Sequence, residues 1–304
     1  MNLTVTVSPH IKSKDNIQKV MLDVIIALTP AAALAVWFYQ YKALFLIITC
    51  VASCCLTERI SQKIIKRKDT LFDLSAVVTG LLLAFCLPPA IPLWIAAAGG
   101  VFAISVGKVI FGGLGHNPFN PALVGRAFLQ ISWPKDMSLW TTPYDALTTA
   151  TPLSIAKFHL PRSIPDNWTL FFGNFAGSLG ETPKLMLLLG ALYLIYRKRI
   201  KLHTPLSYIV TAAVFALFFK ENPIFHLLTG GLILGAFFMA TDPVTTPLSR
   251  NGKIIFGIGC GLLTMIIRLK GGFPEGVCYS ILIMNMLTPF IDKMTVVKKF
   301  GGGP

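Results

Sequence analysis

Long apolar runs, separated by short polar or basic stretches, make up most of the chain. About ten runs have lengths close to what a helix needs to cross a bilayer: residues 20–40, 43–56, 72–87, 91–111, a short fifth run that ends near Trp133, 185–196, 205–219, 224–240, 254–269 and 277–291. This pattern predicts an all-α polytopic membrane protein with about ten transmembrane helices.

The two halves of this pattern resemble each other. Each half has a Thr-Gly pair, a run that ends in proline and then a double glycine after the next run: Thr79-Gly80, Pro88-Pro89 and Gly112-Gly113 in the first half, and Thr229-Gly230, Pro243 and Gly271-Gly272 in the second. An odd number of spans in each half inverts the second half relative to the first. We therefore predict two inverted five-helix repeats, residues 20–133 and 185–292, joined by the region 134–184.

Composition and charge agree with a membrane protein. Of the 304 residues, 54% are hydrophobic and 13% charged, and the mean hydropathy is +0.68, whereas soluble domains carry roughly 25% charged residues. The net charge of +14 comes from short clusters of Lys and Arg between the apolar runs, such as 59–68 and 197–201. Because no basic helix with interleaved aromatic residues is present, we do not expect nucleic acid to bind.

The basic clusters also predict the orientation. With a cytoplasmic N-terminus and every run crossing, most Lys and Arg residues fall on the inner side, as the positive-inside rule requires. A re-entrant fifth run would place the 197–201 cluster and the basic tail outside. We therefore expect cytoplasmic segments at 1–19 and 293–304 and an outer-face region at 134–184.

Several kinds of site are not expected. The six cysteines form no CxxC pair and have no histidine at ligand spacing, and the five histidines are scattered, so no metal site is predicted. The sequence has no Walker loop, Rossmann fingerprint or hydrolase triad. Residues 1–19 are polar and lack the apolar core of a cleavable signal peptide. We therefore expect no complete active site in this chain alone.

A polar loop between the two halves is the first candidate site. Residues Asp145–Thr151 contain three threonines and one aspartate, and Pro152 prevents a regular helix from starting earlier. Taken alone, such a cluster is typical of ordinary turn chemistry.

Two aspartates lie inside or at the end of apolar runs. Asp23 is in the first run, where a carboxylate is either an ion, proton or cofactor contact or lies close enough to the interface to be hydrated. Asp242 follows Thr241 where the eighth run ends at Pro243, and there it either binds a polar ligand or ion or caps a helix.

Polar residues also surround the start of the fifth run. Asn117 and Asn120, each followed by proline, either hold the amide edge of a flat heterocycle or satisfy a broken backbone. Arg126 further along either holds a phosphate or anionic ring or extends to the outer interface. Residues 177–182 (GSLGET) are typical of a helix N-terminus, where both anion binding and plain capping are open.

These motifs together resemble a known family. Asp145–Thr151 (DALTTAT) is similar to the flavin attachment motif of membrane subunits in respiratory sodium or proton pumps, and four further motifs follow the same order as in that family: GHNPFNPA at 115–122, GSLGET at 177–182, FMATDP at 238–243 and GGFPEG at 271–276. The family includes the B subunit of sodium-translocating NADH:quinone reductase and the D subunit of the Rnf ferredoxin:NAD oxidoreductase. The short N-terminal segment with Ser8-Pro9-His10 is more similar to the Rnf protein.

The resemblance implies cofactors and the residues that hold them. It implies FMN joined through its phosphate to Thr151, and a non-covalent riboflavin near Asn117 and Asn120. It further implies cofactor contacts from the remaining polar residues of these motifs, and ion coupling through two carboxylates. The expected further contacts are Arg126, Asp145, Thr148, Thr241 and Asp242, and the ion-coupling candidates are Asp23 and Asp242. Thr149 stands where the family usually has glycine, which removes a permissive backbone position.

The implied function is that of an electron-relay subunit in a redox-driven ion-translocating oxidoreductase, and the resemblance implies that its membrane is a bacterial or archaeal cytoplasmic membrane. Its expected partners are the other Rnf membrane subunits, an outer-face flavoprotein subunit and a flavin transferase for maturation, while ferredoxin and NAD act through partner subunits. Two other interpretations of the same pattern are a secondary transporter with inverted repeats and no flavin, and a structural membrane subunit without a cofactor.

Overall fold

The computed structural model describes residues 16–66, 70–144, 147–182 and 184–295, and within them the regular structure is helical. The first five predicted runs contain α1 (Ile17–Tyr39), α2 (Tyr41–Ile64), α3 (Ser75–Phe85), α4 (Leu93–Ile104) and α5 (Pro121–Ser132). The last five contain α8 (Lys184–Tyr196), α9 (His203–Phe218), α10 (Pro223–Leu228) with α11 (Leu232–Leu234), α12 (Arg250–Lys270) and α13 (Val277–Met294). The all-α prediction is therefore confirmed for this part of the chain.

Three of these helices are long and apolar enough to cross a membrane by themselves. They are α1, α2 and α12, and the chain is a membrane protein. The other helices in the described ranges are shorter or less apolar, so about ten crossings stays a prediction. α2 extends to Ile64, well beyond the predicted end at Leu56, because Glu58 is buried on its inner face while Arg59 and Lys63 extend into solvent.

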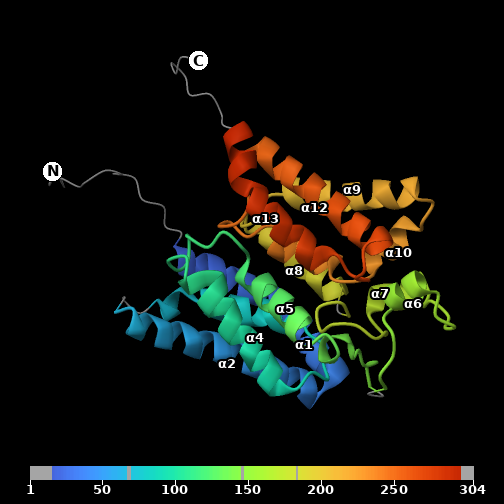
Figure 1. Cartoon of the computed structure of the whole chain (residues 1–304), viewed down its shortest axis with the longest axis horizontal. Helices are drawn as coiled ribbons and strands as arrows, with labels where there is room; N and C mark the ends of the chain where they lie inside the picture. The colour runs from blue at the N-terminus through green and yellow to red at the C-terminus, as the bar shows by residue number, and fades with distance from the viewer. Residues whose placement is uncertain (1–15, 67–69, 145–146, 183, 296–304) are drawn as a thin grey trace.

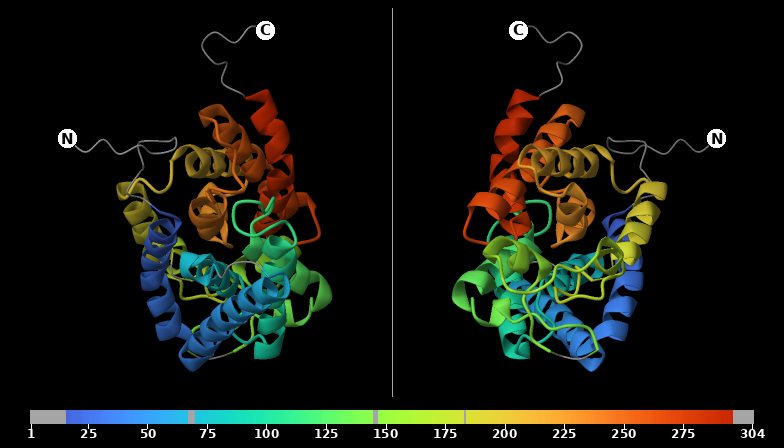
Figure 2. Two further views of the ribbon diagram at one scale, coloured as in Figure 1. Left: turned by 90° about the vertical axis from the view of Figure 1, so that its left-hand side faces the viewer. Right: turned by 90° about the vertical axis from the view of Figure 1, so that its right-hand side faces the viewer.

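The two halves use the same packing pairs. α2 packs on α3 and α4 in the first half, and α9 packs on α10 and α12 in the second, while α4–α5 corresponds to α12–α13. Across the halves, α1 lies against α8 and α5 lies against α13 (Figures 1 and 2). This arrangement supports the predicted repeat, whose inverted relation remains a prediction.

Two helices break inside the protein. α3 ends at Phe85, and the loop 177–182 satisfies the free carbonyl groups there, because Gly180 N–H donates to Phe85 O (2.8 Å) and Leu179 N–H donates to Leu87 O (3.3 Å). A helix, α8, begins after this loop as predicted, and two of the loop's backbone N–H groups pair with the broken helix, while anion binding there stays a prediction. The equivalent break after α10 is capped by Arg268, whose guanidinium donates to His226 O (2.6 Å) and Thr229 O (3.0 Å).

π-helical turns extend two of the helices. η2 (Ser105–Val109) continues α4, and η4 (Gly235–Met239) continues α11. Such turns are rare and often occur at functional sites.

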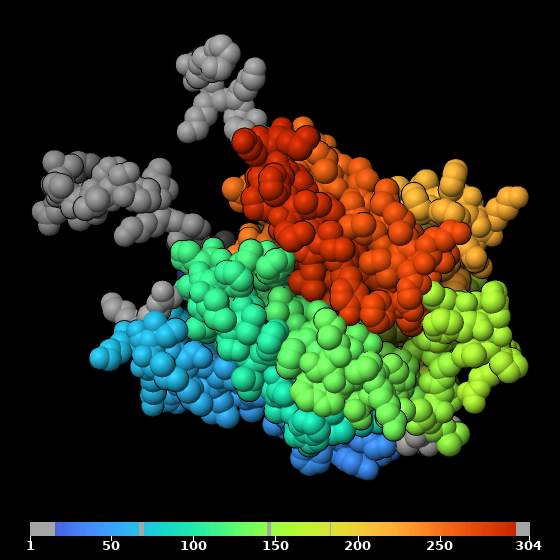
Figure 3. Space-filling view, viewed as in Figure 1, coloured from blue at the N-terminus to red at the C-terminus, as the bar shows by residue number. Residues whose placement is uncertain are grey.

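The region between the halves lies at one end of the molecule. It contains the 3₁₀ turn η3 (Asp136–Ser138) and the short helices α6 (Pro152–Phe158) and α7 (Asn167–Phe172). Figure 1 shows α6 and α7 at the end opposite to the start of α1 and the end of α13. The space-filling view shows this region in contact with both halves (Figure 3).

Candidate functional site

A cavity of about 580 Å³ lies where the two halves meet, and we call it the inner cavity. It is lined by the first turns of α1 and α3, the loop before α5, the end of α8 and the turn after η4. Four residues singled out from the sequence line it together: Asn117, Asn120, Thr241 and Asp242. Its volume falls within the range of small-molecule sites, roughly 300–1,000 Å³.

The two asparagines have different roles in the wall of the inner cavity. Asn120 caps α5, because its Oδ1 accepts from Ala122 N–H (3.1 Å) and Leu123 N–H (3.4 Å) while its Nδ2 donates to Met239 O of the other half (3.4 Å). Asn117 donates to Phe119 O (3.0 Å), but its buried Oδ1 has no protein partner among the described residues. A buried acceptor of this kind favours a ligand that brings an N–H or O–H group.

Thr241 and Asp242 stabilise the turn that closes η4. Thr241 Oγ1 donates to Phe237 O (2.6 Å), and Asp242 accepts from Val244 N–H (3.2 Å) and Thr245 Oγ1 (3.4 Å). Both residues also line the inner cavity. The predicted capping role and the predicted contact with a ligand are therefore compatible at this position.

We call the polar loop Asp145–Thr151 the threonine loop. Its described residues are hydrogen-bonded to the segment that precedes it. Asp145 lies outside the described residues, so its predicted cofactor contact has no structural description. Thr149 N–H donates to Trp140 O (2.8 Å), and Thr148 bridges to Thr141 with its own side chain exposed. Two residues later, Thr151 is buried and caps α6 by accepting from Ser154 N–H (3.2 Å).

A second cavity, of about 310 Å³, lies beside this loop, and we call it the outer cavity. Aromatic side chains form much of its lining: Trp140, Phe158, Phe273 and Tyr279. Trp140 is hydrogen-bonded to the threonine loop, and Phe158 is the last residue of the helix that Thr151 caps.

One cation of α6, Lys157, joins this helix to the end of α12. Lys157 Nζ donates to Ile267 O (3.2 Å), Gly271 O (2.5 Å) and Phe273 O (2.7 Å), which caps the end of α12. Burial lowers the pKa of Lys157 below its usual value, while the three carbonyl groups favour the charged form.

Arg126 belongs to the outer cavity and not to the asparagine pair. Its guanidinium forms an ion pair with Glu275, both side chains are largely buried, and Glu275 also accepts from Gly231 N–H (2.7 Å). The predicted extension of Arg126 to the outer interface is therefore wrong, because this carboxylate holds it in the protein interior.

The sequence of the chain is similar to those of a known protein family. A model of the NQR2, RnfD, RnfE family matches residues 4–301. The chain belongs to this family. The chain is 49% identical, over 99% of its length and 96% of the relative, to the D subunit of the Na⁺-translocating ferredoxin:NAD⁺ oxidoreductase complex of Acetobacterium woodii.

Other members of the family cover the chain equally well. The D subunit of the proton-translocating ferredoxin:NAD⁺ oxidoreductase complex of Clostridium ljungdahlii is 45% identical over 98% of this chain and 96% of the relative. The D subunit of the ion-translocating oxidoreductase complex of Escherichia coli (strain SE11) is 35% identical over 97% of each chain. The predicted relationship to the Rnf D subunit is thus confirmed.

Asp23 lines neither cavity itself, but its partner Arg199 lines the inner cavity. Asp23 is 3% exposed and joins α1 to α8, because it accepts from Arg199 Nε (2.6 Å) and Tyr193 Oη (3.0 Å) and also pairs with Arg197 (3.4 Å). It is therefore not hydrated at an interface. Its charge is already balanced by two arginines, which favours a structural role.

Sequence reasoning missed several buried charges. Lys108 and Glu58 form an ion pair. Glu275 lines the outer cavity, and Arg268 caps the broken end of α10. A signal for two of them existed, because Lys108 and Arg268 both fall within predicted apolar runs, where charged residues are rare. Within the described ranges, His, Cys, Asp and Glu form no cluster that could hold a metal ion.

Proposed function

We propose that this chain is the flavin-carrying electron-relay subunit of a membrane complex that couples ferredoxin:NAD⁺ oxidoreduction to Na⁺ or H⁺ translocation. The observation that carries the proposal is the inner cavity, which brings four motif residues from both halves together around the unpartnered Oδ1 of Asn117. The names of the D subunits in this family supply the reaction and the partners, namely the other Rnf subunits.

In this proposal, riboflavin occupies the inner cavity. The buried acceptor of Asn117 fits the imide N–H of an isoalloxazine ring or a ribityl hydroxyl, and the apolar walls from α1, α3 and η4 fit the ring itself. Asn120 fixes the loop that presents Asn117, because it ties this loop to Met239 of the second half.

FMN, bound covalently to Thr151, places its ring in the outer cavity in the same proposal. The hydrogen bond between Thr149 and Trp140 holds the attachment loop beside that cavity, and four aromatic side chains offer faces for a flat ring. Arg126 and its ion-pair partner Glu275 both stand in the cavity wall, where the guanidinium can face an anionic ring. A flavin supplies one- or two-electron chemistry, while the protein holds it and sets its surroundings.

The arrangement at the membrane follows from the predicted topology. The inner cavity opens near the cytoplasmic ends of α1 and α3, and Thr151 lies at the outer face, where we also place the contact with the outer-face flavoprotein subunit. A flavin transferase attaches FMN there. The alternative, a secondary transporter, shares the broken helices and central cavity but gives no role to the threonine loop beside an aromatic cavity.

The inner site is tested by comparing Asn117→Leu with Asn251→Leu in the purified complex. Asn251 is exposed on α12 and lies away from both cavities. Acid denaturation releases non-covalent flavin for identification, and we expect riboflavin from the wild type and Asn251→Leu but little from Asn117→Leu. A wild-type complex that releases no flavin, yet moves a solute across vesicles, would instead establish the transporter.

The ion-coupling role predicted for Asp23 can be separated from a structural one. Because Asp23 is paired with two arginines, we expect Asp23→Asn to lower the stability of the protein by about 1–3 kcal/mol and to leave ion transport coupled to electron transfer. Thermal unfolding of the complex and ²²Na⁺ or proton uptake into proteoliposomes measure the two effects. Loss of ion uptake at full electron transfer would restore the coupling role to Asp23.

A further inference from the structure

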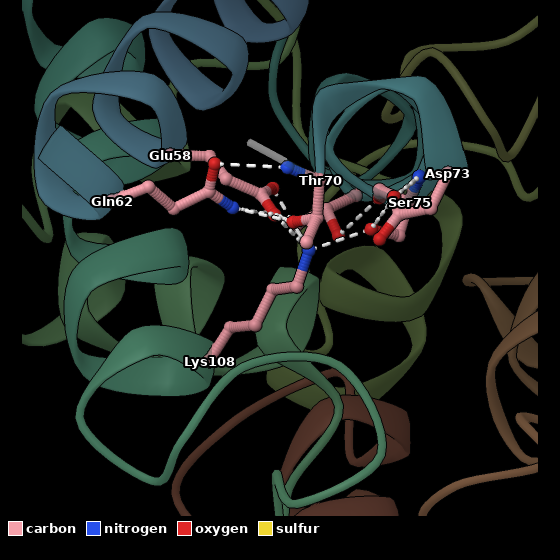
Figure 4. Close-up of polar contacts among 7 residues, drawn as sticks. Glu58, Gln62, Thr70, Asp73, Ser75 and Lys108 are labelled. Atoms are coloured by element: carbon pink, nitrogen blue, oxygen red, sulfur yellow. Dashed lines mark hydrogen bonds and ion pairs between the residues drawn. The ribbon is translucent and has the colours of Figure 1, made fainter. Parts of the chain in front are cut away.

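A buried lysine separates the inner cavity from a glutamate on α2 (Figure 4). Lys108, in η2, is 1% exposed, and its Nζ donates to Glu58 Oε1 (2.7 Å) and Oε2 (2.8 Å) and to Ser75 Oγ at the start of α3 (2.6 Å). Lys108 and Ser75 both line the inner cavity, whereas Glu58 does not. The Lys108 ammonium group is thus bonded to a buried carboxylate and to Ser75, and both Lys108 and Ser75 belong to the cavity wall.

The hydrogen bonds continue from Glu58 to the surface. Glu58 Oε1 accepts from Thr70 Oγ1 (3.0 Å), and the Thr70 residue is exposed. Gln62 Nε2 donates to Glu58 (3.1 Å) and to the Thr70 hydroxyl. This end of α2 carries Arg59 and Lys63, so the proposed topology places it at the cytoplasmic face. A continuous row of polar groups thus connects cytoplasmic water with the inner cavity.

Stability alone does not explain this row. A buried ion pair loses its hydration, and a well-packed apolar pair of similar size is often as stable or more stable. By contrast, a hydroxyl, a carboxylate and an ammonium group can each release one proton and accept another. An electron that enters a cavity of low dielectric constant is costly unless positive charge follows it.

We propose that Thr70, Glu58 and Lys108 deliver protons from the cytoplasmic surface to the inner cavity when the flavin there is reduced. This inference rests on the proposed function. For each electron that arrives from the redox partner, the Lys108 ammonium gives one proton to the cavity and becomes a neutral amine. The Glu58 carboxylate then takes one proton from water through the Thr70 hydroxyl and passes it to the Lys108 amine, so both groups return to their ion-paired state and the net change is one electron and one cytoplasmic proton transferred to the cavity.

Ser75 positions Lys108 and forms a branch separate from Thr70, because it continues to the half-buried Asp73. The Ser75 hydroxyl accepts from Lys108 and donates to Asp73, which also accepts from Ser75 N–H (2.7 Å). Other titratable or charged groups that neighbour the path or share the cavity wall are Cys54 and Cys55 on α2, Asp73 on the 3₁₀ turn η1 (Leu71–Asp73), Lys198 and Arg199 after α8, and Asp242 after η4.

Thr70 is the residue of the path whose substitution leaves the buried ion pair between Glu58 and Lys108 intact. Glu58→Gln or Lys108→Met would leave a buried charge without its partner and would damage the fold. Thr70→Val removes only a hydroxyl, and Glu58 keeps its bonds to Lys108 and to the Gln62 amide, which does not relay protons. Thr57→Val is the matched control. The Thr57 hydroxyl lies on α2 beside Glu58, but it donates to Ser53 O (2.7 Å) and is not part of the path.

The experiment follows proton uptake by the purified complex after flash photoreduction with a deazaflavin. Absorbance of the non-covalent flavin and of a pH indicator is recorded in H₂O and D₂O. We expect Thr70→Val to slow both signals by about tenfold or more, and Thr70→Ser and Thr57→Val to match the wild type. Wild-type rates and isotope effect in Thr70→Val, with its flavin content unchanged, would overturn the proton path alone.

Flavin content separates this outcome from failure of the proposed function. Acid extraction of the wild-type complex is done first. If no non-covalent flavin is released, the inner flavin site and the proton path that serves it are both overturned.

Discussion

Replacing Thr151 with alanine is expected to give a chain without covalent flavin, and electron transfer through the complex then falls to background. The reason is that the proposed phosphoester would require the Thr151 hydroxyl, and no other residue of the described loop has the same position as cap of α6. Intact-chain mass spectrometry and flavin fluorescence on a denaturing gel measure the change directly. The whole adduct, and not a fraction of it, should disappear.

A loss of folding has to be distinguished from a loss of the hydroxyl. Removing an N-terminal helix cap costs about 1 kcal/mol, which is small for a protein of this size. Thr151→Asn keeps a good cap but has no hydroxyl, so it should fold like the wild type and still carry no flavin. Thr149→Gly, which introduces the glycine usual in the family, should keep the adduct. An unmodified wild-type chain, produced together with a competent flavin transferase, would contradict the covalent attachment.

Arg126→Met is expected to lower the free energy of unfolding by about 3–5 kcal/mol, because it leaves Glu275 buried without its counter-charge. The hydrogen bond from Gly231 N–H satisfies only part of that carboxylate. Thermal unfolding of the purified protein in detergent, or its level in the membrane, should show the loss.

A double variant identifies the cause of that loss. Arg126→Met combined with Glu275→Leu removes both charges, so most of the stability should return. If the single variant is as stable as the wild type, Arg126 and Glu275 are not a buried ion pair in the folded protein. The flavin content of the double variant then reports whether Arg126 also contributes to the outer cavity.

The hydrophobic pattern was sufficient to locate the helices and to indicate which loops matter. The runs around α1, α9 and α12 were predicted to within four residues at each end, because each is long and bounded by polar residues. Asn117 and Thr241 were each predicted as a cofactor contact, and the inner cavity brings them together. What these residues bind stays a prediction.

The pairing of the buried charges was beyond the reach of the sequence pattern. Glu58 and Lys108 are 50 residues apart and Arg126 and Glu275 are 149 apart, and no local periodicity relates such positions. Lys108 stands near the end of a predicted run, and η2 places it against Glu58. The π-helical turns depend on tertiary packing, so residue preferences alone do not predict them.

The break at the end of α3 has a consequence for biosynthesis. The carbonyl groups of Phe85 and Leu87 receive their hydrogen bonds from Leu179 and Gly180, which the ribosome adds only after the first five helices and most of the region 134–184. Free carbonyl groups are costly in lipid, so α3 must wait within the insertion machinery or beside water until the later loop arrives. The first half therefore receives two of its hydrogen bonds only from a stretch that is translated after the loop Asp145–Thr151.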